Sequence, residues 1–250
     1  MWQKHKTKII VALLVTAVLA AAFYIGGNAP GSKGWGTRDS GNGEDAGATA
    51  DSSPTTDTTA SDTSTDDKPS GEVTASGMII DPETGKDKYL TDPVPEGKPV
   101  PVEPQDVIIG NTAYTCTLSI NCATILNNMD LCDNDKKELV PADGWILKPI
   151  TVTFYEGESV FNLLQRVCKQ QKIHMEFENT PIYNSAYIEG IHNLYEFDVG
   201  ALSGWMYSVN DWFPNYGCSR YALKDGDVIC WVYTCDLGQD VGGGYAVGGK

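Results

Sequence analysis

Histidine and cysteine are the side chains of the C-terminal half of this chain that could support catalysis or metal binding. His174 lies six positions after Cys168, across the end of an expected helix, and His192 lies in an expected turn. A thiol and an imidazole activate one another only within hydrogen-bond distance, which this spacing does not favour. The sequence also lacks Cys-x-x-Cys, His-Glu-x-x-His and a glycine-rich phosphate loop. We therefore expect no enzyme activity, no metal site and no required cofactor, and we expect His174 to be a surface imidazole.

The seven cysteines are an odd number, so at least one thiol is free or pairs between molecules. Cys116 and Cys122 lie on one expected strand, where six positions span roughly 20 Å, whereas a disulfide needs Cα atoms about 4 to 7 Å apart. Any bridge must therefore join different elements.

Aromatic side chains are concentrated between Tyr183 and Tyr216, at a density above what a small core needs. Aromatic residues supply a large contact area at low entropic cost together with a polar group, as sites for flat conjugated ligands require. The residues that we expect to bind a ligand are Tyr187, Asn193, Tyr195, Trp205, Tyr207, Trp212, Phe213, Asn215 and Tyr216.

Two groups within this set have different expected environments. Trp205 and Tyr207 share one face of an expected strand, which is compatible with either a core position or a binding site. The residues from Trp212 to Tyr216 follow an expected turn and include a proline. We expect their side chains to be exposed and functional, because loops on a rigid scaffold commonly carry function.

The elements that position these residues are predicted from apolar periodicity. Cys116 to Cys122 alternates apolar and polar residues, and Thr151 to Tyr155 reads as a second strand. Ser159 can cap a helix whose apolar residues recur at i, i+3, i+4 and i+7. Short strands follow up to Val228–Thr234, so the predicted fold is α+β, a β-grasp-like domain with one helix packed on a mostly antiparallel sheet. The expected core positions are Leu118, Ile120, Val152, Phe154, Leu163, Leu164, Val167, Val209, Val228 and Trp231.

An apolar segment near the N-terminus targets the chain to a membrane. Three lysines precede an uncharged run from Ile9 to Ile25, whose length fits either a signal-peptide core or a spanning helix. Hydrophobicity continues past the small residue Ala22, which favours a retained anchor, whereas cleavage there gives a secreted product. By the positive-inside rule, we expect a single pass through the cell membrane with the rest of the chain at the cell surface.

The remaining chain divides by composition. Residues 26–106 are rich in Gly, Ser, Thr, Asp and Pro and are expected to form a disordered acidic tether. Residues 107–238 form the expected binding domain, and residues 239–250 an expected flexible Gly-rich tail. The formal net charge of −15 excludes a nucleic-acid partner, because phosphate backbones are held by clusters of Lys and Arg.

Four motifs in this order carry a family resemblance: GESVFNLL at 157–164, SAYIEGIHNL at 185–194, SGWMYSVN at 203–210 and YALKDGDVICW at 221–231. From Thr115 to Leu237 the chain resembles the transcobalamin C-terminal-like domain family. Asn193 and Asp211 stand where that family usually has a glycine in its turns. The resemblance implies a non-catalytic module that binds cobalamin or another corrinoid as a ligand rather than as a cofactor. Bacterial members with such an anchor and tether resemble surface proteins of Gram-positive bacteria.

Two classes of function follow. In the first, the tethered domain captures a corrinoid or another small ligand and passes it to a membrane transporter for uptake. In the second, it is a cell-surface adhesion module that presents its aromatic loops to a protein or glycan and has no small-molecule ligand. A deep aromatic cavity would favour the first class, and a flat aromatic surface the second.

Overall fold

The computed structural model describes residues 71–247, so the expected membrane segment and the tether up to residue 70 lie outside the described residues. Between residues 71 and 247, no helix is both long and apolar enough to cross a bilayer. The elements in chain order are β1 (Glu72–Val73), β2 (Ile79–Ile80), η1 (Pro104–Asp106), β3 (Ala113–Asn121), α2 (Ala123–Leu126), η2 (Lys137–Leu139), β4 (Trp145–Tyr155), α3 (Val160–Gln171), β5 (Met175–Thr180), η3 (Pro181–Tyr183), β6 (Ser185–Ile191), β7 (Leu194–Tyr195), β8 (Gly204–Val209), η4 (Cys218–Arg220), β9 (Val228–Thr234), η5 (Gln239–Val241) and η6 (Gly244–Val247).

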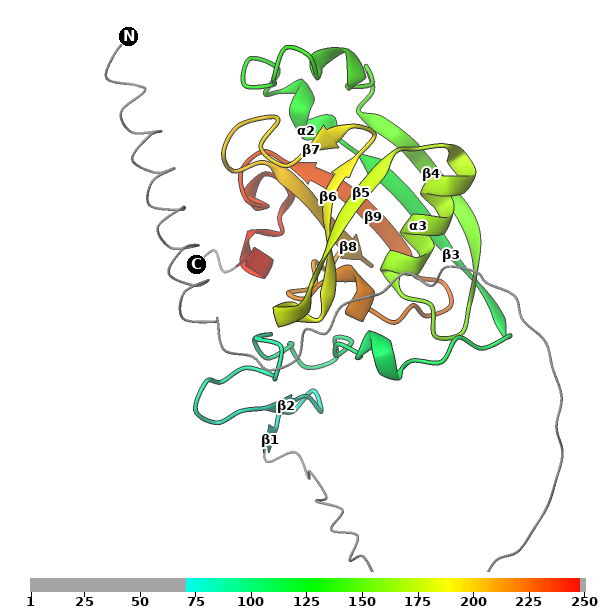
Figure 1. The fold of residues 1–250 in the computed structure, drawn as a ribbon, viewed down its shortest axis with the longest axis vertical. Helices are drawn as coiled ribbons and strands as arrows, with labels where there is room; N and C mark the ends of the chain where they lie inside the picture. Colours follow the sequence, from blue (N-terminus) through cyan, green and yellow to red (C-terminus); the bar gives the residue numbers. More distant parts are fainter. Residues whose placement is uncertain (1–70, 248–250) are drawn as a thin grey trace, which may run out of the picture. The chain divides into compact units, whose positions relative to one another are not determined.

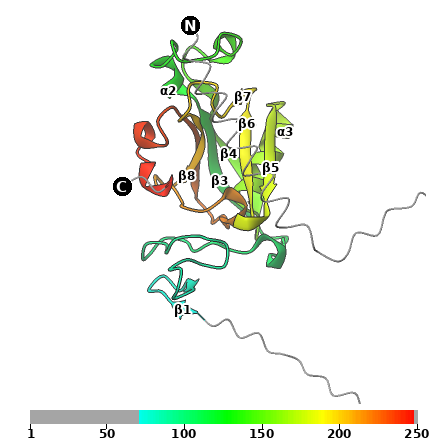
Figure 2. The same ribbon diagram turned by 60° about the vertical axis from the view of Figure 1, so that its left-hand side comes forward.

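The domain contains both strands and helices and is built mostly from sheets, as the predicted α+β class requires. A four-stranded sheet has the order β4-β3-β9-β8, in which β3 and β9 are parallel and the outer pairs are antiparallel. A three-stranded antiparallel sheet has the order β5-β6-β7. The helix α3 and the smaller sheet lie on the same face of the four-stranded sheet (Figures 1 and 2). The core lies between these two layers.

The strand β3 confirms the alternation read from the sequence. Cys116, Leu118, Ile120 and Cys122 are all buried, and the last three are fully buried. Because successive side chains of a strand point to opposite faces, these residues form one face against the helix and the smaller sheet. The strand therefore lies at the centre of the core.

The helix α3 begins where its predicted cap stands. The Ser159 hydroxyl accepts a hydrogen bond from the N–H of Asn162 at 3.2 Å, and the Asn162 side chain accepts one from the N–H of Ser159 at 2.9 Å. This reciprocal capping box satisfies two backbone donors that a helix start leaves free. The apolar stripe of the helix is buried as predicted, at Val160, Leu163, Leu164 and Val167.

Nine of the ten expected core positions are buried, but the prediction that Val228 is buried is wrong. Its side chain is 50% exposed, whereas Ile229 and Trp231 are buried. In a strand, residues three positions apart point to opposite faces, so Val228 and Trp231 cannot both face the core. The register with β3, which pairs Ile120 with Trp231, selects the odd-numbered residues of β9 for the interior.

Residues 71–106, here called the arm, are folded rather than disordered, which corrects the expectation for the described part of the tether. The arm contains the β1–β2 pair, and Met78 and Val94 are buried. The N–H of Val102 donates to the carbonyl of Arg220 at 2.9 Å, and the Tyr216 hydroxyl donates to the carbonyl of Pro99 at 2.7 Å. The proline-rich composition of the arm does not predict these contacts, because the residues that it contacts lie more than a hundred positions away in the sequence.

The C-terminal tail is also more ordered than its composition suggests. Residues up to Val247 form the short 3-10 helices η5 and η6. The Tyr245 hydroxyl accepts a hydrogen bond from the N–H of Phe213 at 2.9 Å. Gly243 lies against the ring of Phe213, where a Cβ atom would come within 2.7 Å of the ring. Glycine is therefore required at this contact, rather than serving only for flexibility.

The two turns that lack the usual glycine still adopt left-handed backbone conformations. His192 and Asn193 both have φ of +59°, and Asn210 and Asp211 have φ of +52° and +60°. Two consecutive positive φ angles are typical of tight turns between antiparallel strands, and Asn and Asp tolerate this conformation better than most residues. Asn193 and Asp211 therefore adopt the turn conformation that glycine would otherwise provide.

Candidate functional site

A cavity of about 380 Å³ lies between the two sheets. The strand β6 contributes Ala186 and Ile188 to one wall, and β8 contributes Trp205, Met206 and Tyr207 to the other. Side chains from both faces of β8 line the cavity, so it runs along the edge of this strand. The full lining is Leu90, Thr91, Thr180, Tyr183, Ser185, Ala186, Tyr187, Ile188, Trp205, Met206, Tyr207, Pro214, Asn215, Tyr216, Gly217, Cys218, Arg220, Trp231, Ala246 and Val247.

The structure brings five of the nine sequence-predicted site residues to this cavity: Tyr187, Trp205, Tyr207, Asn215 and Tyr216. The sequence left open whether Trp205 and Tyr207 are core residues or binding-site residues, and the structure shows that they are in the core and also line the cavity. Both belong to the buried core, with exposed fractions of 9% and 7%, and both line the cavity. The cavity is therefore an extension of the core rather than a surface loop site.

The other four residues lie elsewhere. Asn193 is exposed in a turn, and Tyr195 lies under the ammonium group of Lys136, 4.7 Å from the ring centroid. Trp212 and Phe213 are buried outside the cavity lining. The predicted site is thus divided between the cavity wall, the core and the surface.

The expectation that the loop from Trp212 to Tyr216 is exposed is wrong for its aromatic residues. Trp212, Phe213 and Tyr216 are each only 7% exposed. The arm covers this loop, since Lys98 lies over the ring of Trp212 at 5.5 Å and Pro99 accepts the Tyr216 hydroxyl. The tail covers Phe213. Two segments expected to be disordered therefore account for the burial of this loop.

Sequence reasoning missed the cavity residues that come from distant segments. Leu90 and Thr91 belong to the arm, and Ala246 and Val247 to the tail. Trp231 was assigned to the core alone, although it also lines the cavity. The nearly continuous apolar run of β9 predicts burial of Trp231 but not its contact with the cavity, and no sequence signal existed for Leu90.

Hydrogen bonds fix the aromatic walls of the cavity. The indole N–H of Trp205 donates to the carbonyl of Leu194 at 2.8 Å. The Tyr207 hydroxyl donates to the carbonyl of Tyr216 at 2.9 Å. Burial raises the pKa of Tyr207 well above its ordinary value, and it also raises the pKa of Tyr216. Both phenols are therefore neutral donors at physiological pH.

Three side-chain atoms of residues that line the cavity are buried without a hydrogen-bond partner among the described residues. They are the indole N–H of Trp231, the Nε–H of Arg220 and the Oδ1 of Asn215. The orientation of the Asn215 amide is set by its other end, which donates to the carbonyl of Asp92 at 3.0 Å. A buried polar group without a partner costs about 1 to 3 kcal/mol. All three atoms are closed off from solvent, so a molecule in the cavity as it stands does not reach them.

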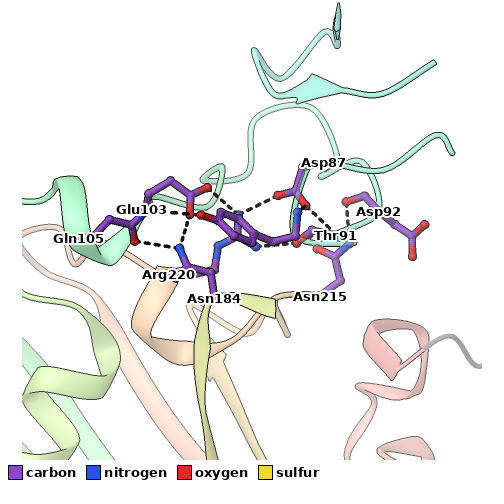
Figure 3. A network of polar contacts seen from close by, with 9 residues as sticks. Asp87, Thr91, Asp92, Glu103, Gln105, Asn184, Asn215 and Arg220 are labelled. Atoms are coloured by element: carbon purple, nitrogen blue, oxygen red, sulfur yellow. Dashed lines mark hydrogen bonds and ion pairs between the residues drawn. The ribbon is translucent and has the colours of Figure 1, made fainter. Parts of the chain in front are cut away.

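Arg220 joins the cavity to the arm (Figure 3). Its guanidinium group is 1% exposed and donates to Thr91 at 2.7 Å, to Asp87 at 2.7 Å and to Glu103 at 3.0 Å. The ring of Tyr89 lies 5.0 Å from the guanidinium carbon. One cation thus faces two carboxylates, so the site offers little attraction to an anionic ligand.

Tyr187 sits at the boundary between the cavity and the outer face of the smaller sheet. It is 47% exposed and donates its hydroxyl to Glu196. Burial, followed by this hydrogen bond, raises the pKa of Tyr187 above its ordinary value. The outer face also carries His174, whose imidazole lies 3.1 Å from Glu176. This face is acidic and aromatic.

All seven cysteines are free in the structure. Burial raises the pKa of the thiols of Cys116, Cys122, Cys168 and Cys218 to about 12. A thiol of this kind is protonated and unreactive at neutral pH. Within residues 71–247, no group of three or more His, Cys, Asp or Glu side chains is placed to hold a metal ion.

Comparisons with known proteins give a limited similarity. A family model described as a domain of unknown function, DUF4430, matches residues 157–235, which is less than half of the chain. No curated protein matches the sequence.

Two solved structures are similar to the chain at low identity. Haptocorrin in complex with Cbi is 12% identical with a TM-score of 0.37, over 50% of this chain and 26% of that chain. The second, from Ruminococcus gnavus ATCC 29149, has a description that names metal binding; it is 11% identical with a TM-score of 0.30, over 48% of this chain and 96% of that chain. The chain thus spans about a quarter of haptocorrin, and similarity at this level does not transfer a ligand.

Proposed function

We propose that residues 71–247 form a binding module for a small molecule, which the module holds in the cavity between β6 and β8. The observation that carries this proposal is the cavity itself, which measures about 380 Å³ and is walled by the aromatic residues Trp205, Tyr207 and Trp231. Mostly apolar walls with a few polar groups are typical of ligand sites. The strand order with a parallel β3–β9 pair supports the β-grasp-like fold within this proposal.

The anchor and the tether place this module outside the membrane, where it captures its ligand for uptake. The sequence resemblance makes cobalamin or another corrinoid the first ligand to test. A cavity of about 380 Å³ is at the lower end of the range for drug-sized ligands. A corrinoid is larger than this, so only one edge or one substituent of it fits inside. A compact ligand fits the cavity as a whole.

The test uses two leucine substitutions in the full chain. Ala186 lines the cavity and is buried, so Ala186→Leu fills it, whereas Ala201→Leu adds the same side chain at an exposed position. Tryptophan fluorescence would follow titrations with N-benzylacetamide, cyanocobalamin and cobinamide. We expect at least one of them to bind the unaltered chain, and we expect Ala186→Leu but not Ala201→Leu to abolish that binding.

Binding that survives Ala186→Leu would place the ligand elsewhere, and the absence of binding by any of these compounds at about 10 mM would contradict the proposal. Thermal unfolding of both variants serves as the control for folding. Filling an existing cavity does not lower stability when the added side chain fits.

The adhesion module stays the second candidate because of one observation. Ile182, Tyr183 and Phe197 are 59%, 51% and 60% exposed, and exposed large apolar side chains commonly mark contact surfaces. A protein or glycan partner that binds equally well to the chain with Ala186→Leu, and less well to the chain with Phe197→Ala, would favour adhesion over capture of a small ligand, because Phe197 does not line the cavity.

A further inference from the structure

The outer edge of β8 presents unpaired backbone groups. The register with β9 pairs Met206 with Val232 and extends to Asn210, whose N–H donates to the carbonyl of Val228 at 2.9 Å. In an antiparallel pair, the N–H and C=O of one residue point to the same side, and the side alternates along the strand. The even-numbered residues of β8 therefore face β9. The backbone groups of the odd-numbered residues face away from the sheet.

The backbone groups of Trp205 and Tyr207 are the ones at this free edge. Among the described residues, neither N–H nor C=O of these two residues has a hydrogen-bond partner outside the β8–β9 pair. Both residues are buried and line the cavity. A buried backbone group needs a partner, because leaving it unpaired costs as much as a lost hydrogen bond.

The strand across the cavity does not supply these partners. The strand β7 pairs with β6 only at Gly190 and Ile191, so β6 also has an open edge further along. On that edge, Ala186 donates its N–H to the Ser219 hydroxyl at 3.0 Å. The cavity is therefore a gap between two strand edges, and the backbone groups of Trp205 and Tyr207 that face it have no partner among the described residues.

We infer that the site recognises an amide group flanked by apolar substituents, which adds to the edge of β8 as a further strand adds to a sheet. This inference rests on the proposed function and names the chemistry of its ligand. A trans amide directs its N–H and its C=O to opposite sides, so a single amide donates its N–H to one backbone carbonyl of β8. Two successive amides that flank one residue, as in an extended peptide, present both an N–H and a carbonyl to the same strand edge. The aromatic rings of Trp205 and Tyr207 contact the flanking groups.

The charges around the cavity agree with a neutral ligand of this kind. Arg220 is already neutralised by Asp87 and Glu103, so a carboxylate gains little there. A short extended peptide and a small molecule with an amide substituent share this chemistry.

The experiment compares matched probes on the full chain by calorimetry. N-benzylacetamide and benzyl acetate have the same shape, but the ester lacks the N–H donor. We expect the amide to bind about fivefold or more tightly than the ester, because the ester leaves a buried carbonyl of β8 unpaired. The ketone 4-phenylbutan-2-one, in which a methylene replaces the amide N–H, should bind like the ester.

A third probe separates the two sources of amide. N-acetyl-phenylalanine methylamide carries two amides in the geometry of a peptide. Tighter binding of this probe than of N-benzylacetamide indicates a peptide, and weaker binding indicates a small molecule with one amide. Both results are compatible with amide recognition.

The experiments distinguish a failure of this inference from a failure of the proposed function. If benzyl acetate binds as tightly as N-benzylacetamide and Ala186→Leu abolishes both, the cavity binds ligands but does not select an amide. If no probe binds, the proposed function fails as well. Hydrogen exchange gives an independent readout: the N–H of Trp205 or Tyr207 should become protected when N-acetyl-phenylalanine methylamide binds, and unchanged exchange rates at both would overturn the inference.

Discussion

The carboxylate of Asp87 joins the arm to Arg220 in η4, although the two residues lie far apart in the sequence. Its Oδ2 accepts a hydrogen bond from the buried guanidinium group at 2.7 Å. Its Oδ1 accepts hydrogen bonds from the N–H groups of Tyr89 and Thr91 at 2.9 and 2.8 Å, which fixes the turn that carries Leu90. Because Leu90 and Thr91 line the cavity, this carboxylate holds part of the site in place.

The first prediction concerns this carboxylate. Asp87→Asn keeps an acceptor for the turn but removes the charge that faces Arg220. We expect the free energy of unfolding to fall by about 2 kcal/mol, as for a lost hydrogen bond to a buried charge. Urea unfolding followed by fluorescence measures the change.

Asp92→Asn is the matched control for Asp87→Asn. Its ion pair with Lys86, at 2.6 Å, lies in the same arm, but the Asp92 side chain is 66% exposed. We expect a loss of less than about 0.5 kcal/mol, because exposed ion pairs contribute little. Equal losses for the two variants would show that the buried contact to Arg220 has no special weight.

The second prediction compares two tryptophans that line the same cavity. Trp205→Phe leaves the carbonyl of Leu194 without its donor, whereas Trp231→Phe removes an N–H that has no partner among the described residues. Both changes remove similar volume, so we expect Trp205→Phe to lower the free energy of unfolding by about 1 kcal/mol more than Trp231→Phe. Urea unfolding of the two variants decides this, and the reverse order would contradict the hydrogen-bond assignment.

The third prediction concerns the start of α3. Ser159→Ala removes the hydroxyl that accepts the N–H of Asn162, and we expect the protein to lose about 1 kcal/mol of stability. Ser159→Asp should restore most of this loss, because Asp is also a good N-cap and carries a negative charge favourable at a helix start. Thermal unfolding of both variants tests the cap, and a failure of Asp to restore stability would contradict a capping role.

The fourth prediction concerns pH. Burial raises the pKa of the Cys168 thiol to about 12, from an ordinary value of 9.0. Above pH 9 the unfolded chain releases this proton and the native chain retains it, so rising pH favours unfolding. Below pH 9 the thiol is protonated in both states and contributes no pH dependence.

Urea midpoints at pH 8 and pH 10 test this effect. Wild-type protein should lose more stability over this interval than Cys168→Ala, by about 1 kcal/mol. Identical losses would show that the thiol is not shielded in the native state.

Local patterns predicted those elements whose interactions are local. The cap at Ser159 and the stripe from Val160 to Val167 are set by residues within one helix, and the alternation of β3 shows directly in its sequence. The error at Val228 came from assigning burial by residue type where strand alternation decides it. The register that settles the face of β9 is a long-range property.

The site was less predictable because its parts come from distant segments. Composition alone marks the arm as disordered, yet Arg220 binds Asp87 from 133 positions away. The aromatic density drew attention to Trp212 and Phe213, whose burial under the arm and the tail no local pattern reveals. The same aromatic density also predicted Tyr187, Trp205 and Tyr207, which do line the cavity.

The most direct test of ligand binding in this cavity is an amide-resolved NMR titration of the full chain with N-benzylacetamide. The indole N–H of Trp231 and the backbone N–H of Tyr207 give separate signals from the paired strands β9 and β8 on one wall of the cavity, and Ile188 reports from β6 on the other wall. The account predicts that both signals, and that of Ile188, shift and saturate together. Shifts confined to the outer face around Tyr195 and Glu176, with Trp231 and Tyr207 unchanged, would contradict it.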